Sequence, residues 1–264
     1  MEKSRYLLFV LLACFAVANL RAANDCVFIT TGTTLTLQND CMTDASLLVP
    51  QGFTMDLNGH TVTAHDPTGD HFRGGVITNG GTAASVTNGT IQASGLSDVC
   101  DGGADRLRGV LFDGAAGSIT NLKVQNINQG ASGCQEGNAI EVRNAPFDNT
   151  GTDVAVTITG NTVTNYQKNG ITANGSVAAI IVNNVVTGAG PVNYIAQNGI
   201  QIGFGATAVV RGNTVSGNDY TPISDVACGI LYFTADGVRA SENKMSNNER
   251  NICNFGKGEG HPTF

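Results

Sequence analysis

The stretch Val156-Thr-Ile-Thr-Gly-Asn161-Thr-Val-Thr-Asn165 returns in altered form as Ala208-Val-Val-Arg-Gly-Asn213-Thr-Val-Ser-Gly-Asn218. In both copies a short run rich in β-branched residues leads into a turn centred on Asn, and a second short run follows. Asn and Gly tolerate the left-handed backbone that tight turns require. No apolar period of 3.6 residues accompanies these runs, so the pattern predicts strands joined by turns rather than helices.

The same template recurs along most of the chain. Its turn residues are Asn58, Asn88, Asn121, Asn161, Asn184, Asn213 and Asn243. Consecutive turns are 23 to 40 residues apart, which is typical of solenoids built from repeats of about 20–45 residues. We expect the Asn amides of successive turns to stack and to form hydrogen bonds from one repeat to the next.

A second element lies between the turns and supplies a further strand per repeat. Its copies begin at Gly75-Val-Ile, Gly109-Val-Leu, Asn138-Ala-Ile, Asn169-Gly-Ile, Asn198-Gly-Ile and Cys228-Gly-Ile. Each repeat therefore holds about three short strands, and the predicted class is all-β.

These repeats resemble the right-handed parallel β-helix proteins, the pectin-lyase-like solenoids, over roughly residues 35–255. The resemblance implies a right-handed single-stranded parallel β-helix of about seven coils with an N-terminal cap. It implies no particular activity, because unrelated functions share this coil. The paired Asp and Gly-His-Gly motifs of the family's hydrolases are absent, and the Trp-x-Asp-His segment of pectate lyases requires a Trp that this chain lacks.

The predicted organisation is one domain behind a signal peptide. Lys3 and Arg5 precede an apolar run over residues 6–18, and small residues follow, so residues 1–22 are predicted to be a secretory signal peptide. Cleavage after Ala18 and lipidation at Cys14 remain alternatives. Residues 23–264 form the domain, with a cap over 23–57, coils over 58–255 and a tail over 256–264. We expect a secreted or extracellular protein, with the periplasm or the cell surface as other sites.

Six cysteines remain after the signal peptide, and an even number in an exported chain predicts disulfides. In a solenoid only neighbouring coils lie close together. The expected pairs are therefore Cys26–Cys41, Cys100–Cys134 and Cys228–Cys253.

The charge pattern excludes some partners. The net charge is −7 and no Lys/Arg run occurs, so a nucleic-acid surface is not expected. Beyond the signal segment no run approaches the length of a membrane span. We expect a monomer.

Outward positions on the Gly-Ile strands and three long loops predict a groove for a polysaccharide. With Val110, Ile140 and their equivalents inward, period-two alternation turns Asp113, Glu141 and Arg143 outward. Glu141 and Asp113 are the candidate catalytic acid and base, as in sugar cleavage by paired carboxylates. The candidate substrate-binding residues are Arg143, Arg106, Arg108 and Glu136. The alternative is that these are solvated surface charges and that Arg143 neutralises Glu141.

The sequence also contains candidate metal ligands. Asp98, Asp101 and Asp105 are candidate calcium ligands, although they lack the spacing of a calcium loop. His60, His65 and His71 lie near Asp66 and Asp70, but solvent-facing histidines explain them as well. No other cofactor is expected.

Two classes of function follow from these observations. The leading hypothesis is a polysaccharide-binding or polysaccharide-processing protein, with a lyase or a hydrolase as the enzyme class. The alternative is a non-catalytic structural or cell-surface module. Ice binding through Thr rows fits less well, because the outward residues vary among Leu, Glu, Thr and Gln.

Overall fold

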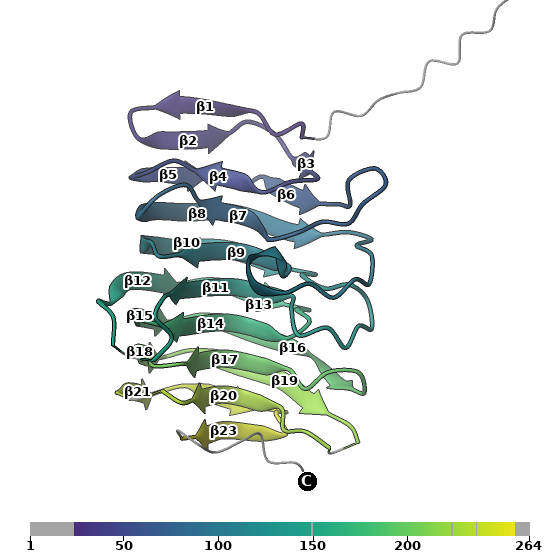
Figure 1. Cartoon of the computed structure of the whole chain (residues 1–264), viewed down its shortest axis with the longest axis vertical. Helices are drawn as coiled ribbons and strands as arrows, with labels where there is room; N and C mark the ends of the chain where they lie inside the picture. The colour runs from purple at the N-terminus through teal and green to yellow at the C-terminus, as the bar shows by residue number, and fades with distance from the viewer. Residues whose placement is uncertain (1–23, 149, 223, 236, 257–264) are drawn as a thin grey trace, which may run out of the picture.

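The computed structural model describes residues 24–148, 150–222, 224–235 and 237–256. The predicted signal peptide and nearly all of the predicted tail lie outside these residues. The described chain winds into coils stacked along one axis, with β1 at one end and β23 at the other (Figure 1). This arrangement confirms the predicted all-β parallel β-helix.

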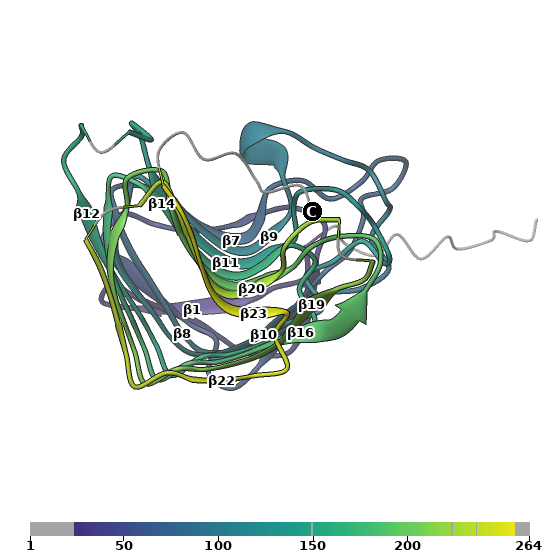
Figure 2. The same ribbon diagram turned by 90° about the horizontal axis from the view of Figure 1, so that it is seen from below.

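One face of the coil is an eight-stranded parallel sheet. Seen along the axis, this sheet curves inward between the loops that rise on its two sides (Figure 2). Its strands, in spatial order, are β4 (Leu47–Val49), β7 (Gly75–Asn79), β9 (Arg108–Asp113), β11 (Asn138–Asn144), β14 (Asn169–Gly175), β17 (Asn198–Gly203), β20 (Cys228–Phe233) and β23 (Arg250–Phe255).

The other faces belong to a fifteen-stranded sheet that bends at the Asn turns. One part consists of β1 (Phe28–Thr31), β2 (Thr34–Leu37), β5 (Phe53–Asp56), β8 (Ala83–Ala93), β10 (Ala116–Gln125), β12 (Val154–Thr159), β15 (Val177–Val182), β18 (Thr207–Arg211) and β21 (Val238–Ser241). The other part consists of β3 (Cys41–Thr43), β6 (Thr61–Ala64), β13 (Thr162–Thr164), β16 (Val185–Val192), β19 (Thr214–Tyr220) and β22 (Lys244–Ser246), and it joins the first through β8 and β10.

The strand pairing is parallel from β2 onward. Only β1 runs antiparallel to its partner, β2, and it lies at the N-terminal end of the stack. β2, β3 and β4 already pair in parallel with β5, β6 and β7, so most of the region predicted as a cap has the register of a coil.

The core is a continuous column of aliphatic side chains inside the coil. The predicted inward residues Val110, Ile140, Ile171, Ile200 and Ile230 are all fully buried in it. Burying an aliphatic side chain of this kind stabilises the fold by about 1.5–3 kcal/mol, so one such residue per coil fixes the stacking.

The sequence pattern suggested seven equivalent Asn turns, but the structure shows two kinds. In the first three turns Asn58, Asn88 and Asn121 themselves adopt a positive φ. In the last four turns the residue before the Asn has the positive φ, and it is Gly160, Asn183, Gly212 or Glu242. The following Asn161, Asn184, Asn213 and Asn243 then turn their amides toward the neighbouring coils, as the hydrogen bonds between them show.

The structure contains three disulfides, and their pairing is the one predicted: Cys26–Cys41, Cys100–Cys134 and Cys228–Cys253. No helix in the described part of the chain has the length and hydrophobicity that crossing a membrane requires.

Candidate functional site

The outer face of the eight-stranded sheet presents three columns of side chains that run along the coil axis. The first column is Arg108, Asn138, Asn169, Asn198 and Cys228. The second column is Leu111, Glu141, Thr172, Gln201 and Leu231, and the third is Asp113, Arg143, Asn174, Gly203 and Phe233.

The first column arises from a break in strand alternation. A side chain at Gly170 would run into Val186 in the core, and one at Gly199 would run into Val215. Glycine and the isoleucine after it therefore both face inward, and the residue before the glycine is left on the outside. Simple period-two alternation would have placed Asn138, Asn169 and Asn198 in the core.

Three loops form a wall beside these columns, and they are fastened to one another. His71 Nε2 lies 2.9 Å from an oxygen of Asp101, and the backbone N–H of Asp101 donates to Glu136 at 2.8 Å. The Cys100–Cys134 disulfide joins the second and third loops. The three long loops noted in the sequence, at residues 66–73, 94–108 and 129–137, are therefore joined into one unit.

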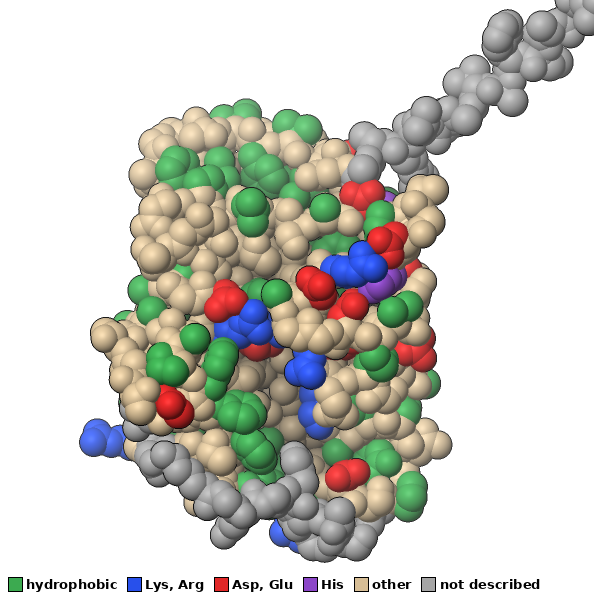
Figure 3. Space-filling view, in the orientation of Figure 1, with side chains coloured by type: hydrophobic (Ala, Val, Ile, Leu, Met, Phe, Trp, Pro, Cys, Tyr) green, Lys and Arg blue, Asp and Glu red, His purple; other side chains and the backbone are tan. Residues whose placement is uncertain are grey.

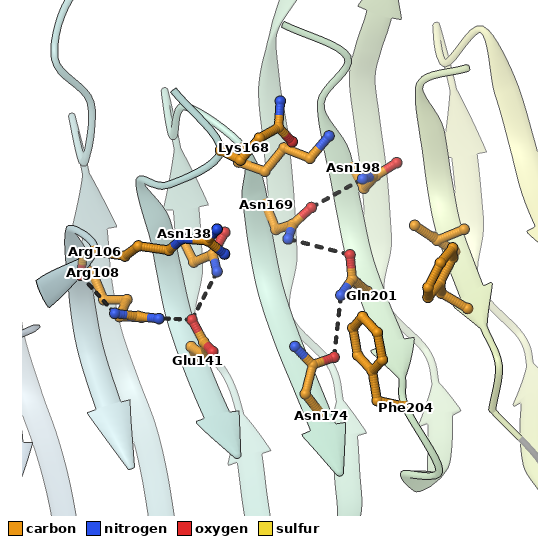
Figure 4. Close-up of a pocket in the computed structure, with 13 residues that line it drawn as sticks. Arg106, Arg108, Asn138, Glu141, Lys168, Asn169, Asn174, Asn198, Gln201 and Phe204 are labelled. Atoms are coloured by element: carbon orange, nitrogen blue, oxygen red, sulfur yellow. Dashed lines mark hydrogen bonds and ion pairs between the residues drawn. The ribbon is translucent and has the colours of Figure 1, made fainter. Parts of the chain in front are cut away.

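Against this wall the sheet face holds a groove of about 200 Å³ that extends from β9 to β20. Its lining includes Arg106 and Gln135 from the wall, and Asn138, Glu141, Asn169, Asn198 and Gln201 from the sheet (Figure 4). In Figure 3 basic side chains lie near the middle of this face, and hydrophobic side chains form a run over its lower part. Five strands at about 4.8 Å spacing make the groove about 19 Å long.

Arg108 and Glu141 form a buried ion pair in the groove floor. Arg108 Nε donates to Glu141 at 2.6 Å, and both side chains are at most 5% exposed. The remaining Arg108 nitrogens donate to the backbone carbonyls of Gly103, Ala104 and Arg106. Glu141 also accepts from Asn138. The expectation that these groups are exposed is wrong, because the loop ending at Arg106 covers Arg108 and binds its guanidinium. Both residues line the groove, and their roles in binding and catalysis stay predictions.

Glu136 is also an internal residue. It is 1% exposed, and its two carboxylate oxygens accept from the backbone N–H groups of Asp101 and Leu107. Glu136 therefore shapes the wall and does not line the groove. The sequence could not reveal this role, because both backbone contacts are made to the neighbouring loop, about 30 residues earlier in the chain.

Asp113 and Arg143 pair with each other outside the groove. Arg143 Nη2 lies 2.7 Å from Asp113, whose side chain is 50% exposed. Asp113 lines a separate hollow with Arg73, Asn79 and Asp105. Glu141 stands opposite Leu111 in the register, so Glu141 and Asp113 are not directly opposed. The structure thus gives the two predicted carboxylates different partners and different surroundings.

Amide side chains connect the middle strands of the groove. Asn198 donates to Asn169, Asn169 donates to Gln201, and Gln201 donates to Asn174 (Figure 4). Within the described residues, the buried oxygens Asn138 Oδ1 and Thr172 Oγ1 have no hydrogen-bond partner. The floor is thus a preorganised network of amides, with two buried oxygens that lack a partner.

Two cations in the groove lack a carboxylate partner. Among the described residues, no Asp or Glu oxygen lies within 4.0 Å of the charged nitrogens of Arg106 or Lys168. Lys168 Nζ donates to the carbonyl of Ala196 at 2.8 Å. Burial lowers the pKa of Lys168 to about 8, and the negative charge of Asp225 partly opposes this shift. The groove is therefore locally positive at neutral pH, although the whole chain is negative.

Aromatic residues lie at the C-terminal end of the groove. The rings of Phe204 and Phe233 have centroids 5.1 Å apart at an interplanar angle of 58°. Gly203 lies between Asn174 and Phe233 in its column and contributes no side chain. The groove accordingly changes from polar and positive to apolar along its length.

The candidate metal ligands do not gather at one point. Within the described residues, the sets of three close ligand groups are Asp25, Cys26 and Cys41, and Cys100, Cys134 and Glu136. The cysteines in both sets form disulfides. Asp101 contacts His71, while His60 lies beside Asp40 and His65 beside the carbonyl of Asp66. Calcium at Asp98, Asp101 and Asp105 stays a prediction.

Lys168 and Gln135 are groove residues that the sequence reasoning missed. Asn138, Asn169 and Asn198 could have been found, since each begins a Gly-Ile-type strand in the repeat. No sequence signal singles out Lys168. Its position depends on Gly170 facing inward and on the segment that carries Ala196.

Comparison with known proteins supports the fold and leaves the activity open. Residues 147–258 match the family model described as the right-handed beta helix region. No curated protein and no solved structure matches the chain. The matched region covers the last coils, and the same parallel pairing continues on its N-terminal side back to β2. The chain therefore has the fold of a right-handed parallel β-helix.

Proposed function

We propose that the groove between β9 and β20 binds an extended acidic polysaccharide outside the cytosol. One observation carries the proposal: a groove about 19 Å long crosses five strands and holds two cations, Arg106 and Lys168, without a carboxylate partner in the described chain. A carboxylate-bearing chain would gain charge-assisted hydrogen bonds there. The three disulfides fit an oxidising compartment.

The rest of the groove suits sugar rings. Sugar hydroxyls both donate and accept hydrogen bonds, and the amides of Asn169, Asn198 and Gln201 offer both functions. The rings of Phe204 and Phe233 supply apolar surface at one end. A site of this kind has a few convergent polar groups beside aromatic side chains, which is common in ligand pockets.

The geometry favours binding over cleavage. Glu141 is held by Arg108 and Asn138, and Asp113 is held by Arg143. Acid–base catalysis on a sugar needs two carboxyl groups with separate roles near one bond. In this groove Glu141 is the carboxylate that reaches the lining, and its charge is already neutralised.

The test is a binding measurement with matched linear oligosaccharides, one of uronic acids and one of neutral sugars. We expect the protein to bind the acidic oligomer. Arg106→Ala should weaken binding about tenfold or more, since a hydrogen bond to a charged group contributes about 1.5–3 kcal/mol. Arg239→Ala is the matched control, because Arg239 is exposed and lies on the far sheet.

Two results would contradict the proposal: no acidic oligomer binds, or Arg106→Ala binds as well as the wild type. Release of reducing ends or of unsaturated sugars during the same incubation would show turnover. That outcome would favour the lyase or hydrolase alternative over simple binding.

A further inference from the structure

A second hollow of about 280 Å³ adjoins the groove. Gln135 and Lys168 line both spaces and so form the partition between them. The second hollow is otherwise lined by Tyr194, Ala196, Tyr220 and Asp225, together with Ile195. None of these five residues borders the first groove.

Besides the partition, segments of two successive coils build this hollow. Tyr194 and Ala196 lie between β16 and β17, Tyr220 ends β19, and Asp225 lies between β19 and β20. The backbone of Tyr220 is in register with Val192, which brings the end of β19 beside the end of β16. The Lys168 ammonium donates to the carbonyl of Ala196 and fastens this segment to the partition.

The chemistry of the second hollow differs from that of the groove. Two tyrosines and one carboxylate line it together with the apolar residues Ile195 and Ala196. Burial raises the pKa of Tyr194, so its hydroxyl stays protonated and can donate at neutral pH. Asp225 would repel a carboxylate ligand but accepts hydrogen bonds from hydroxyl groups. Tyrosine rings pack against apolar faces and keep a polar tip. These features select an uncharged, hydroxyl-rich ring.

We propose that the second hollow binds a neutral sugar branch of the glycan whose acidic main chain lies in the groove. The inference rests on the proposed function, because the main chain must first pass Lys168. At that point a substituent on the sugar above the partition would reach the second hollow directly. The protein would then distinguish a branched acidic glycan from a linear one of the same length.

The experiment compares two acidic oligosaccharides of equal length by titration calorimetry, one linear and one with a single neutral sugar branch. We expect the branched ligand to bind about tenfold more tightly, a gain of about 1.4 kcal/mol. Tyr220→Ala should remove this gain and leave the affinity for the linear ligand unchanged. Asp225→Asn should also remove the gain, but it lowers the pKa of Lys168 further and so weakens the linear ligand as well. Tyr220→Phe, which keeps the ring, should retain most of the gain.

Phe147→Ala is the matched aromatic control, because Phe147 is 47% exposed and lies in the segment between β11 and β12. Equal binding of the two ligands by the wild type would overturn the branch site while leaving the groove proposal intact. Equal loss of both ligands in Tyr220→Ala would overturn it as well. If neither ligand binds the wild type, the proposed function itself fails. Melting temperatures of all variants identify any that do not fold.

Discussion

At the scale of single residues, the clearest feature of the site is the buried charge of Arg108, which stabilises the fold. Arg108 is 2% exposed and donates to one carboxylate and to three backbone carbonyls. It therefore holds the segment 103–106 against the sheet and positions Arg106 over the groove. Removing one partner of such a pair leaves an uncompensated buried charge, which costs more than the pair itself contributes.

The first prediction concerns this pair. Arg108→Ala should lower the free energy of unfolding by about 3–5 kcal/mol, because Glu141 would remain buried without its cation. Urea unfolding followed by circular dichroism measures the change. Arg143→Ala on the next strand is the control, and it should cost about 1 kcal/mol or less because its partner Asp113 is half exposed. Equal losses in the two variants would show that the burial of Arg108 does not matter.

The second prediction concerns Lys168, whose pKa burial lowers to about 8. Below this value the side chain is charged and attracts an anionic ligand, and above it the charge is lost. The affinity for an acidic oligosaccharide should therefore fall as pH rises from 7 to 9. The other charged and titratable groups near Lys168 are Tyr194, Tyr220 and Asp225 in the second hollow and Arg106 in the groove.

Calorimetric titration at several pH values provides the measurement. In Lys168→Arg the cation stays charged throughout this range, so affinity should become independent of pH. A wild-type affinity that is constant from pH 7 to 9 would exclude Lys168 as a contact of the anionic groups.

At the scale of structural elements, a ladder of buried Asn side chains joins the last coils. Asn161 donates to Asn184, Asn184 to Asn213, and Asn213 to Asn243, at 2.9–3.0 Å. The side-chain amide of each Asn also donates to a backbone carbonyl of the preceding coil. The side-chain oxygens of Asn184, Asn213 and Asn243 also accept from the backbone N–H of the preceding Asn in the ladder. The ladder thus satisfies the polar groups of a buried corner where no strand pairing is available.

The third prediction is that Asn184→Ala lowers the free energy of unfolding by about 2–4 kcal/mol. The substitution leaves buried donors and acceptors on both neighbouring coils without hydrogen-bond partners. Asn243→Ala should cost clearly less, because Asn243 is the end of the ladder and is only partly buried. Urea unfolding compares the two with Thr162→Ala, an exposed position in the same turn region. Similar values for all three variants would show that the ladder does not stabilise the coil.

The elements also show how far the sequence pattern carries. The repeat spacing predicted the turns, the inward isoleucines and the three disulfide pairs, because each depends on local backbone preference or on adjacency of coils. It did not predict the outward Asn column, because that depends on two consecutive inward residues at Gly170-Ile171 and Gly199-Ile200. Nor did it predict the Arg108–Glu141 pair, because the covering loop, and not the strand pattern, buries these two side chains.

At the scale of the whole molecule, each coil contacts mainly the coils before and after it, so stability is a sum of neighbour interactions. The two ends differ in this respect. At the N-terminal end β1 pairs antiparallel with β2, and the Cys26–Cys41 disulfide fastens it. At the C-terminal end β21 and β22 are largely exposed and form the edges of their sheet, and Ile252 in β23 is 50% exposed.

This asymmetry leads to the fourth prediction, which concerns amide hydrogen exchange. Backbone amides at an unpaired edge open at a lower free energy than amides held between two strands. Exchange followed by mass spectrometry should therefore be fastest in β21 and β22 and slowest in β11, β14 and β17. The Cys228–Cys253 disulfide ties β23 to β20, so mild reduction should speed exchange in β23 while leaving β11 and β14 unchanged. One uniform exchange rate across all these strands would mean that the coils unfold together, and stability could then not be divided among neighbouring pairs.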